Sequence, residues 1–504
     1  MMFSHARVWV LGAGSMGAGI AQVAAQAGHE VCLYDAKPQA LERALAAIAA
    51  DLEGAVSRGK LQPERRGEIL GRIRPAAQLE AGRRSGIVVE AIIEDLGAKQ
   101  ELLRQVEPLV DGSALLLSNT SSLSITAIAA ALARPQRVAG WHFFNPAVRM
   151  KLVEIIPGVQ TEPAVIDDLR ALSRAWGKTA VIAPNVPGFI VNRVARPYYA
   201  EAWRLLAEQA APAPAIDALL RQAGGFALGP FELMDLIGHD VNLAVTESVF
   251  RATGFDPRYA PALMQQELVR AGHFGRKSER GLYRYGTDAA KPACPTVVPA
   301  PDIPKVRHAP TPGLLGPLLK RLCDAGVTVE TDAALPEETL AVGHSRIAVT
   351  DGRTAAHRAV AESQPDLILL DYALDFANAS LLGATATSTA VADRDALAAA
   401  LHAAGVGLVE LTDVAGLVVM RIVAALVNEA ADLASWNMVS AADIDLAMQL
   451  GTSYPRGPLA WGQWLGAARV HTVLRHLAEH YGDARYRIAP RLSASRWNGA
   501  ALDA

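Results

Sequence analysis

The sequence predicts an α/β doubly wound domain, then an all-α domain, and then a degenerate duplicate of both. Three observations support this prediction. Residues 1–184 alternate short apolar runs with helical stretches, which is typical of a parallel sheet covered by helices. Apolar residues recur at helical spacing after residue 185, and later segments repeat motifs of the first half. The chain of 504 residues is also too long for one compact core.

Changes in composition set the expected boundaries. A run of prolines after residue 291 indicates an extended linker between the two halves. The expected segments are an α/β domain (1–184), a helical domain (185–290), a Pro-rich linker (291–313), a degenerate α/β domain (314–410) and a second helical domain (411–504).

The first element, residues 8–35, has the pattern of a strand, a glycine turn, a helix and a second strand. Gly12, Gly14 and Gly17 have the spacing of a dinucleotide-binding turn, in which backbone N–H groups at the helix start face a pyrophosphate. Asp35 ends the second strand, where a carboxylate accepts hydrogen bonds from the ribose hydroxyls. Because this carboxylate would repel a 2′-phosphate, the predicted cofactor is NAD rather than NADP.

A long helical stretch, residues 41–70, is expected next. Basic residues cluster in its second half and just beyond it: Arg58, Lys60, Arg65, Arg66, Arg72 and Arg74. Two interpretations stay open, a solvated helix face and a cationic surface for a phosphate-bearing substrate. Further strands are expected at 86–92, 114–117, 138–140 and 150–156.

Four polar residues are candidates for chemistry. His142 is expected just past the strand at 138–140, at the carboxyl edge where open α/β sheets bind ligands, and an imidazole gives or takes a proton near neutrality. Glu154, on the next strand, could orient that ring. The Ser121 hydroxyl could donate to a substrate oxygen, and the Asn192 amide, in the other domain, could bridge the cleft and hold a carbonyl oxygen. The alternatives are a histidine bonded to a backbone carbonyl, a glutamate on a strand edge, a helix-capping role for Ser121, and a helix-terminal hydrogen bond for Asn192.

Composition limits the classes of function. Hydrophobic residues make up 51% of the chain, charged residues 20%, and the net charge is −3, so nothing indicates binding to nucleic acid or to an anionic membrane. Three scattered cysteines suggest neither a disulfide framework nor a metal site. No apolar run is long enough to span a membrane and no leader is recognisable, so we expect a cytoplasmic protein without a metal.

The second half repeats the first in a degenerate form. Residues 412–421 align with 184–193, and 456–459 with Gly466 resemble 228–231 with Gly238. Residues 311–316 and 325–329 resemble the opening strand–helix–strand unit without its first glycine, and residues 367–371 resemble the strand at Val88. Because the repeated glycine turn is damaged, one working cofactor site per chain is expected, and Met420 at the position of Asn192 indicates that the second copy has also lost its chemistry.

Four motifs in combination resemble the L-3-hydroxyacyl-CoA dehydrogenase family. They are Gly12-Ala13-Gly14-Ser15-Met16-Gly17, Ser118-Asn119-Thr120-Ser121-Ser122, His142-Phe143-Phe144-Asn145-Pro146 and Pro187-Gly188-Phe189-Ile190-Val191-Asn192-Arg193. The longer architecture resembles the bacterial phenylacetate-pathway type of this family. The resemblance implies NAD-dependent oxidation of an L-3-hydroxyacyl-CoA, such as the 3-hydroxyadipyl or 3-hydroxybutyryl thioester, to the 3-oxoacyl-CoA in phenylacetate or fatty acid catabolism.

The resemblance also implies roles for individual residues. His142 would be the general base and Glu154 its orienting carboxylate, with Ser121 and Asn192 positioning the substrate. Arg58 and Lys60 would approach the phosphates of coenzyme A. The dinucleotide would be bound by Gly12, Gly14, Ser15, Met16, Gly17, Asp35, Glu94, Lys99, Asn119, Ser121, Asn145 and Lys277.

Two other functions remain open at this point. A β-hydroxyacid dehydrogenase acting on a free acid shares the glycine-rich start, but it uses a lysine for proton transfer, whereas this chain offers His142 and Glu154. A non-catalytic dinucleotide-binding protein would not need these side chains. Family members dimerise through the helical domain, so either a homodimer or an internal pseudo-dimer of the two copies is expected.

Overall fold

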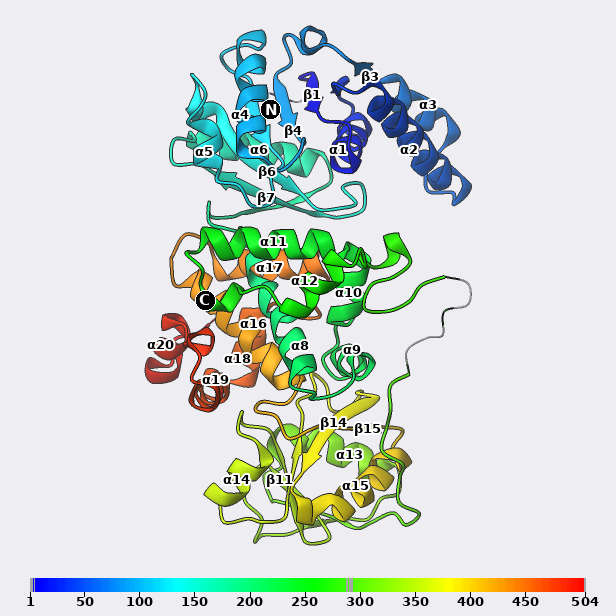
Figure 1. The fold of residues 1–504 in the computed structure, drawn as a ribbon, viewed down its shortest axis with the longest axis vertical. Helices are drawn as coiled ribbons and strands as arrows, with labels where there is room; N and C mark the ends of the chain where they lie inside the picture. Colours follow the sequence, from blue (N-terminus) through cyan, green and yellow to red (C-terminus); the bar gives the residue numbers. More distant parts are fainter. Residues whose placement is uncertain (1–2, 4, 287–288, 290–292, 503–504) are drawn as a thin grey trace. The chain divides into compact units, whose positions relative to one another are not determined.

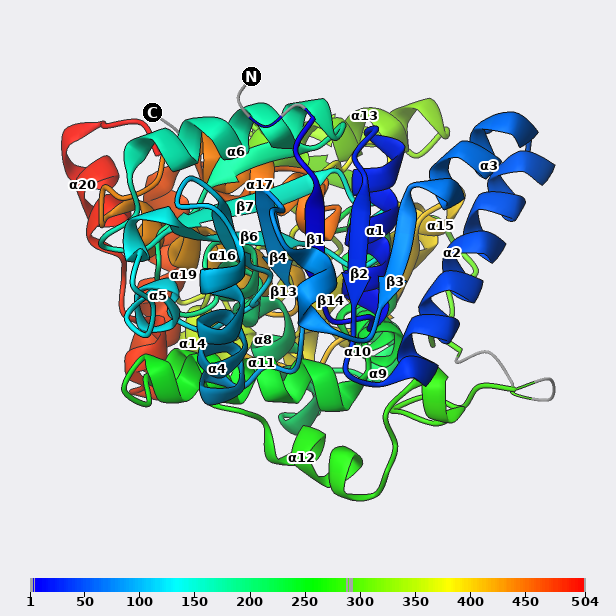
Figure 2. The same cartoon turned by 90° about the horizontal axis from the view of Figure 1, so that it is seen from above.

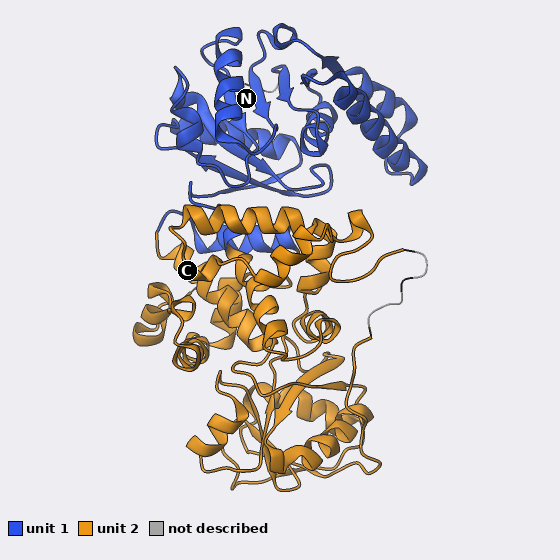
Figure 3. Ribbon diagram, in the orientation of Figure 1, with its two compact units in different colours: residues 1–193, 437–452 blue, residues 194–436, 453–504 orange. Residues whose placement is uncertain are grey.

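The computed structural model describes residue 3 and residues 5–286, 289 and 293–502. They form two compact units, residues 1–193 with 437–452 and residues 194–436 with 453–504 (Figure 3). The expected boundary between residues 290 and 291 lies outside the described residues. A 16-residue segment of the second half therefore belongs to the same unit as the glycine turn, which the expected domain boundaries did not foresee.

The first unit is built on an eight-stranded sheet of the order β3-β2-β1-β4-β5-β6-β7-β8 (Figures 1 and 2). Only β7 and β8 run against the other six strands. The strands are β1 (Val8–Leu11), β2 (Val31–Tyr34), β3 (Ile73–Ala76), β4 (Ile87–Glu90), β5 (Leu115–Ser118), β6 (Val138–Phe143), β7 (Leu152–Pro157) and β8 (Thr179–Ile182). This topology is the expected doubly wound, Rossmann-like domain.

Strands β1, β4 and β5 are buried along their whole length, as central parallel strands covered on both faces must be. The helices of this unit are α1 (Ser15–Gln26), α2 (Pro38–Ser57), α3 (Pro63–Gly71), α4 (Leu96–Val106), α5 (Ile125–Ala129), α6 (Pro163–Ala175), α7 (Val191–Val194) and α17 (Ala441–Thr452). The apolar faces of α1, α2, α3 and α6 share one core with the strands, in which Trp141 and Trp176 pack at 4.6 Å between ring centroids.

The helical stretch expected over residues 41–70 is confirmed, but it is divided into two helices. The chain forms two helices, α2 and α3, which lie beyond β3 at the edge of the sheet (Figure 2). Gly59 takes a left-handed φ of 66° just after α2, and Pro63 begins α3. A glycine in this conformation ends a helix, and proline is favoured in the first turn of the next one.

The strand expected at 138–140 is longer than predicted. β6 continues to Phe143 because the antiparallel ladder with β7 pairs His142 with Glu154 and Phe143 with Val153. His142 therefore lies inside the strand rather than in the loop that follows it. Pairing with β7 is a tertiary constraint that the short apolar run alone did not reveal.

The second unit contains a seven-stranded sheet of the order β10-β9-β11-β12-β13-β14-β15. Its strands are β9 (Val306–His308), β10 (Val329–Thr331), β11 (Thr339–Val342), β12 (Ser345–Val349), β13 (Leu367–Leu370), β14 (Leu381–Ala386) and β15 (Gly407–Glu410). β9 lies inside the stretch expected to be linker, because residues 306–308 pair with both β10 and β11.

Strand β13 has a parallel neighbour, β12, on one side and an antiparallel neighbour, β14, on the other. This is the setting of β6 in the first sheet, whereas β4, the strand at Val88, lies between two parallel neighbours. The expected likeness of residues 367–371 to the strand at Val88 is therefore wrong. Short apolar runs of β-branched and leucine residues do not distinguish one buried strand from another.

Helical segments from both halves of the chain make up the rest of this unit. They are α8 (Arg196–Ala207), α9 (Ala213–Gln222), α10 (Pro230–Ile237), α11 (His239–Ala252), α12 (Leu263–Arg270), α13 (Gly316–Asp324), α14 (Ala355–Ala361), α15 (Val391–Ala403), α16 (Val419–Ala434), α18 (Pro458–Leu465), α19 (Ala467–Tyr481) and α20 (Pro490–Asn498). No helix in the described part of the chain is long and apolar enough to cross a membrane.

Buried ion pairs join α8, from the first half, to α16, from the second. Arg421 on α16 is fully buried, and its guanidinium donates to Glu201 at 2.7 Å and to Glu208 at 2.8 Å. Two tyrosines make matching bonds: Tyr486 Oη donates to Glu201 at 2.8 Å and Tyr259 Oη donates to Glu429 at 2.5 Å.

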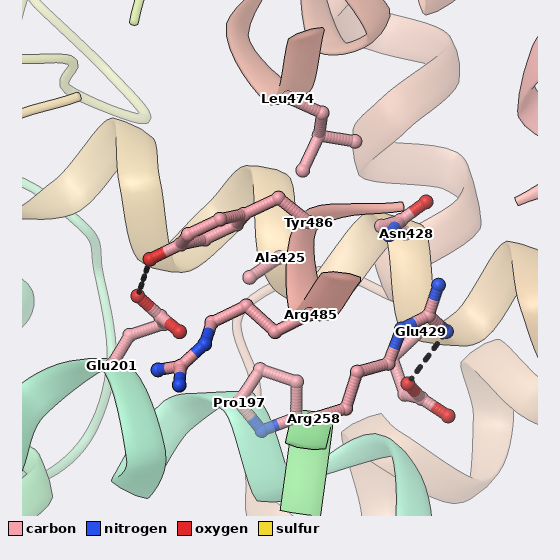
Figure 4. Close-up of a pocket in the computed structure, with 9 residues that line it drawn as sticks. All are labelled: Pro197, Glu201, Arg258, Ala425, Asn428, Glu429, Leu474, Arg485 and Tyr486. Atoms are coloured by element: carbon pink, nitrogen blue, oxygen red, sulfur yellow. Dashed lines mark hydrogen bonds and ion pairs between the residues drawn. The ribbon is translucent and has the colours of Figure 1, made fainter. Parts of the chain in front are cut away.

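A small pocket opens among these side chains. Figure 4 shows the Tyr486–Glu201 bond on one side of it and the Arg258–Glu429 ion pair on the other. Each half of the chain therefore supplies a carboxylate to an aromatic hydroxyl of the other half. Since the charges are buried, removing one partner would leave the other charge unpaired, which is strongly destabilising.

We expect Glu201→Gln to lower the free energy of unfolding at pH 7 and to weaken its dependence on acid. Burial raises the pKa of Glu201, but Arg204, Arg421 and the Tyr486 hydroxyl outweigh this effect and hold the pKa at about 2. A depressed pKa stabilises the fold above the ordinary value near 4.5 and is lost as the pH falls towards 2. The lost contribution is about 3 kcal/mol, measurable by chemical denaturation at several pH values.

The matched control is Glu479→Gln, which breaks the exposed Arg475–Glu479 pair of α19. An exposed ion pair contributes little to the free energy of unfolding, so this variant should keep the pH dependence of the wild-type protein. An unchanged acid dependence in Glu201→Gln would contradict the assignment of a depressed pKa to this buried carboxyl.

Candidate active site

The glycine turn between β1 and α1 has the geometry that a dinucleotide requires. Gly12 has a φ of 105°, and a Cβ placed on it would lie 2.6 Å from the carbonyl oxygen of Ala91. A Cβ on Gly17 would lie 1.8 Å from the carbonyl oxygen of Gly12, so only glycine allows the helix to start this close to the turn.

Gly14 differs, because a Cβ placed on it would point into open space. This open side lies at the start of α1, where Gly14 is the N-cap without a side-chain cap and Ser15 and Met16 begin the helix. Uncapped N–H groups at a helix start attract an anion, so the turn fits a pyrophosphate. The residues present therefore fit NAD.

Asp35 follows β2 and is tied to the glycine turn. Its Oδ2 accepts from the N–H of Ala13 at 2.8 Å, and its Oδ1 accepts from the N–H of Lys37 at 2.9 Å. These bonds hold the carboxylate next to the turn, half-buried and with acceptor capacity left for ribose hydroxyls.

Glu94 is the centre of a polar cluster after β4. Its Oε1 accepts from the Thr120 hydroxyl at 2.7 Å and from the N–H of Ser121 at 2.9 Å. Burial raises the pKa of this carboxyl, but Lys99 and the hydrogen bonds from Thr120 and Ser121 outweigh burial and lower it. The cluster links the end of β4 to the turn after β5.

Lys99, which is expected to contact the dinucleotide, is buried beneath this polar cluster. Its side chain is 1% exposed, and its Nζ donates to Glu90 at 2.7 Å and lies 3.3 Å from Glu94. A buried ammonium needs such partners because desolvation of an unpaired charge is costly. Lys99 is therefore held between Glu90 and Glu94, and its contact with the dinucleotide remains a prediction.

His142 and Glu154 are directly opposite each other in the β6–β7 ladder. His142 Nδ1 lies 2.7 Å from Glu154 Oε2, and the Glu154 side chain is completely buried. The other oxygen, Oε1, accepts from the N–H groups of Ile190 and Val191, both at 3.0 Å. Both oxygens of the carboxylate are thus used, one for the ring and one for the start of α7.

The turn before α7 makes this possible. Gly188 and Phe189 both have left-handed φ angles, 77° and 50°, which turn the next N–H groups towards Glu154. Phe189 and Phe144 also pack against the His142 ring, at 5.8 and 4.5 Å between centroids. With Nδ1 bound to Glu154, Nε2 is the ring nitrogen left for proton transfer.

Ser121 and Asn192 lie together at the same edge. The amide Nδ2 of Asn192 donates to the carbonyl oxygen of Ser121 at 3.5 Å, and the Ser121 hydroxyl lies 3.2 Å from Glu94 Oε1. Asn192 was expected in the other domain, across a cleft. It belongs instead to the same compact unit as Ser121, because α7 is anchored through Glu154.

Two further asparagines connect the strands that form the site. Asn119 Oδ1 accepts from the N–H of Phe143 at 2.8 Å, which ties the turn after β5 to the end of β6. Asn145 Oδ1 accepts from the Ser15 hydroxyl at 3.5 Å, which connects the loop after His142 to the glycine turn. The His142 loop and the dinucleotide turn are therefore in contact.

The expected phosphate-binding residues are less organised. Arg58 and Lys60 lie exposed between α2 and α3, whereas four neighbouring arginines have acidic partners within 4 Å: Arg65, Arg66, Arg72 and Arg74. Lys277 belongs to the second unit, where its Nζ pairs with Asp240 at 2.6 Å. The roles expected of Arg58, Lys60 and Lys277 remain predictions.

Sequence reasoning missed two parts of the site. Glu90 ends β4 fully buried, accepts from Lys99 and from the Ser118 hydroxyl at 2.6 Å, and so connects two strands. An acidic residue ending a strand of otherwise apolar residues was the available signal. The backbone amides of Ile190 and Val191 carry no signal in the sequence. The described residues contain no group of three potential metal ligands.

We expect Asp35→Ala to weaken NADH binding by about 30-fold, because a charge-assisted hydrogen bond contributes about 2 kcal/mol. The preference for NADH over NADPH should narrow at the same time, since the carboxylate no longer repels a 2′-phosphate. Fluorescence titration with both dinucleotides measures the two constants. Asp111→Ala, at an exposed position, is the control. Unchanged NADH affinity in Asp35→Ala would refute the role of this carboxylate.

Comparison with known proteins gives consistent matches over the whole chain. The family model described as 3-hydroxyacyl-CoA dehydrogenase, NAD binding domain, matches residues 7–186. The model of the C-terminal domain of the same family matches twice, at 188–285 and 405–501. A third model, 3-hydroxybutyryl-CoA dehydrogenase reduced Rossmann-fold domain, matches residues 347–414.

Individual relatives agree with these models. The chain is 42% identical over 487 residues to 3-hydroxyadipyl-CoA dehydrogenase from Escherichia coli. This alignment covers 97% of this chain and 96% of the relative. It is 40% identical to a probable 3-hydroxybutyryl-CoA dehydrogenase from Bacillus subtilis, over 55% of this chain and 97% of the relative.

A solved structure of 3-hydroxybutyryl-CoA dehydrogenase from Escherichia coli superimposes with a TM-score of 0.87 at 39% identity, covering 98% of both chains. That of (S)-3-hydroxybutyryl-CoA dehydrogenase from Ralstonia eutropha superimposes with a TM-score of 0.54 at 37% identity, covering 56% of this chain and all of the other. The chain belongs to the 3-hydroxyacyl-CoA dehydrogenase family.

Proposed function

We propose that this protein catalyses the NAD-dependent oxidation of an L-3-hydroxyacyl-CoA to the 3-oxoacyl-CoA. The observation that carries the proposal is the buried His142–Glu154 pair, at 2.7 Å, next to a turn that fits a dinucleotide. The names of the relatives favour 3-hydroxyadipyl-CoA or 3-hydroxybutyryl-CoA as the substrate.

Oxidation of a secondary alcohol removes a proton from oxygen and a hydride from carbon. Bound NAD supplies the hydride acceptor. His142 Nε2 takes the 3-hydroxyl proton, and Glu154 stabilises the imidazolium that forms and keeps Nδ1 protonated towards itself. The two amides on Glu154 keep its second oxygen occupied, so the carboxylate does not rotate away from the ring.

The remaining polar residues position the two ligands. Ser121 and Asn192 hold the oxygen atoms of the acyl group, while Glu94 and Asn119 hold the turn after β5 against the dinucleotide. Exposed Arg58 and Lys60 meet the phosphates of coenzyme A. Binding the coenzyme remotely lets binding energy orient the small reacting group.

We further propose that the second half is a degenerate duplicate of the first. The second match of the C-terminal family model supports it, as do backbone angles: Gly416 and Leu417 have left-handed φ values of 77° and 54°, like Gly188 and Phe189. In the first half the Glu154 carboxylate accepts from the N–H groups of Ile190 and Val191. In the second half the Asp371 carboxylate accepts from those of Val418 and Val419.

In this alignment every residue of the proposed active site is replaced. Asp351 stands at the position of Ser121, where it pairs with Arg353, and Met420 stands at that of Asn192. Asp371 is opposite Gly383 in the β13–β14 ladder, where the first half has His142 opposite Glu154. The second half therefore keeps the fold and has lost the proton-transfer pair.

We also propose that the protein is cytoplasmic and that its two halves pair with each other. Equivalent residues of the two halves make reciprocal contacts within the second unit: Tyr486 with Glu201, and Tyr259 with Glu429. Reciprocal contacts of this kind are the property of an isologous two-fold interface. We propose that the two halves form an internal pseudo-dimer.

We expect wild-type protein to oxidise NADH with acetoacetyl-CoA and with 3-oxoadipyl-CoA, followed by the loss of NADH absorbance. His142→Ala should lower kcat by about 10²- to 10⁴-fold, because general base catalysis has this magnitude. The KM for NADH should change little. His5→Ala is the control, since His5 is exposed and precedes the first strand.

Each result has a distinct meaning. No turnover with any CoA thioester, although NADH binds, would favour the non-catalytic alternative. Turnover with a free 3-oxo acid but not with its thioester would favour a β-hydroxyacid dehydrogenase. Full activity in His142→Ala would remove this residue from proton transfer.

The internal pseudo-dimer predicts that a single chain already satisfies the interface that a two-fold pair requires. We therefore expect light scattering to give the mass of one chain, 53.3 kDa, at micromolar concentration. A concentration-independent mass of twice this value would show that a further interface, between chains, is needed.

A further inference from the structure

We propose that Gly451, in the second half of the chain, is a positioning residue for the His142–Glu154 pair in the first half. Its missing side chain lets α17 approach the backbone that holds Glu154. This inference rests on the proposed function, because it assigns a role to Gly451 in the same reaction.

Helix α17 (Ala441–Thr452) lies within the first compact unit, although its neighbours in sequence belong to the second (Figure 3). It contacts strands β7 and β8. Its buried residues, Ala441, Ile444, Ala447 and Met448, follow helical spacing, and Gly451 continues the same face. The second half thus contributes one helix to the sheet that carries the candidate active site.

Gly451 is in close contact with two residues around Glu154. A Cβ placed on Gly451 would lie 2.8 Å from Leu152 Cδ2 and 3.0 Å from Val191 Cγ2. Leu152 is two residues before Glu154 on β7, and Val191 donates its N–H to Glu154 Oε1 at 3.0 Å. Both side chains are buried, so an added methyl group would press on the packed core around them.

No other feature in the described part of the chain requires a glycine at position 451. Glycine within a helix is unfavourable, and Gly451 does not have the left-handed φ that would require it. Ser453, after the helix, takes that conformation instead, with a φ of 56°. Close approach of another segment is the remaining use of a glycine at this position.

Helix α9, which is the equivalent of α17 in the first half, supports this inference. In the register that aligns Gly457-Pro458 with Gly229-Pro230, α9 has Ala223 at the position of Gly451 and Leu219 at that of Ala447. α9 contacts β14, the strand where Gly383 replaces Glu154. The helix on the sheet without the pair thus carries larger residues, and the helix on the sheet with the pair carries smaller ones.

The effect of a methyl group at Gly451 follows from these contacts. Val191 is β-branched and begins α7, so its side chain has little rotational freedom and pressure on it moves its backbone. Movement of its N–H withdraws one of the two donors from Glu154 Oε1. The carboxylate then no longer holds the His142 ring at the angle needed for proton transfer.

The test is Gly451→Ala in the full chain. We expect kcat to fall about tenfold, as small misplacements of catalytic groups do, while the KM values for NADH and acetoacetyl-CoA stay within about twofold. Gly67→Ala, inside α3 and with nothing within 4 Å of the added methyl group, is the matched control and should keep wild-type kcat.

A second substitution separates positioning from general damage. Val191→Ala removes the methyl groups that Gly451→Ala would strike and keeps the N–H that Glu154 accepts. The double variant Gly451→Ala/Val191→Ala should therefore recover the kcat of Val191→Ala alone, as coupled neighbours do in a double-mutant cycle. Wild-type kcat in Gly451→Ala, or a loss that is the same with and without Val191→Ala, would overturn the inference.

A readout without turnover separates this inference from the proposed function. The proton on His142 Nδ1, which lies between the ring and Glu154, gives an NMR signal that His142→Ala identifies by its loss. We expect Gly451→Ala to shift this signal and the double variant to restore it. An unshifted signal would refute the role of Gly451, whereas a shifted signal in an enzyme that turns over no acyl-CoA would refute only the proposed function.

Discussion

The buried carboxylate of Glu154 is the interaction on which the candidate active site depends. One oxygen binds the His142 ring and the other binds two backbone N–H groups at the start of α7. A charge in this position needs all of these partners, because an ionised group without them is costly to bury. The same carboxylate therefore orients the base and fixes the helix that carries Asn192, and neither function can be changed alone.

Under the proposed duplication, the second half meets the same constraint without a histidine–glutamate pair. A carboxylate still accepts from the amides of Val418 and Val419, but it comes from Asp371, at the position of the histidine, and glycine replaces the glutamate. The helix start remains satisfied while the ring disappears. The Asp371 carboxylate keeps these backbone donors bonded in the absence of a glutamate.

The sequence was sufficient for the parts of the molecule that depend on local pattern. The glycine spacing predicted the turn between β1 and α1, and the strand order predicted that Glu154 lies against the His142 ring, whereas their roles in binding and proton transfer remain predictions. The split of α2 from α3, the full length of β6 and the burial of Lys99 behind Glu94 depend on contacts between distant segments. The place of α17 in the first unit has the same origin, since no local pattern indicates which sheet a helix covers.

The reciprocal bonds of Tyr486 and Tyr259 with Glu201 and Glu429 have a consequence for the evolution of the chain. In a pair of identical subunits each mutation occurs on both sides of the axis, so a residue must serve both environments at once. Joining the two copies in one gene removes that coupling. Under the proposed duplication, Gly451 can be small next to the His142–Glu154 pair while Ala223 keeps its methyl group, an asymmetry that no homodimer can encode.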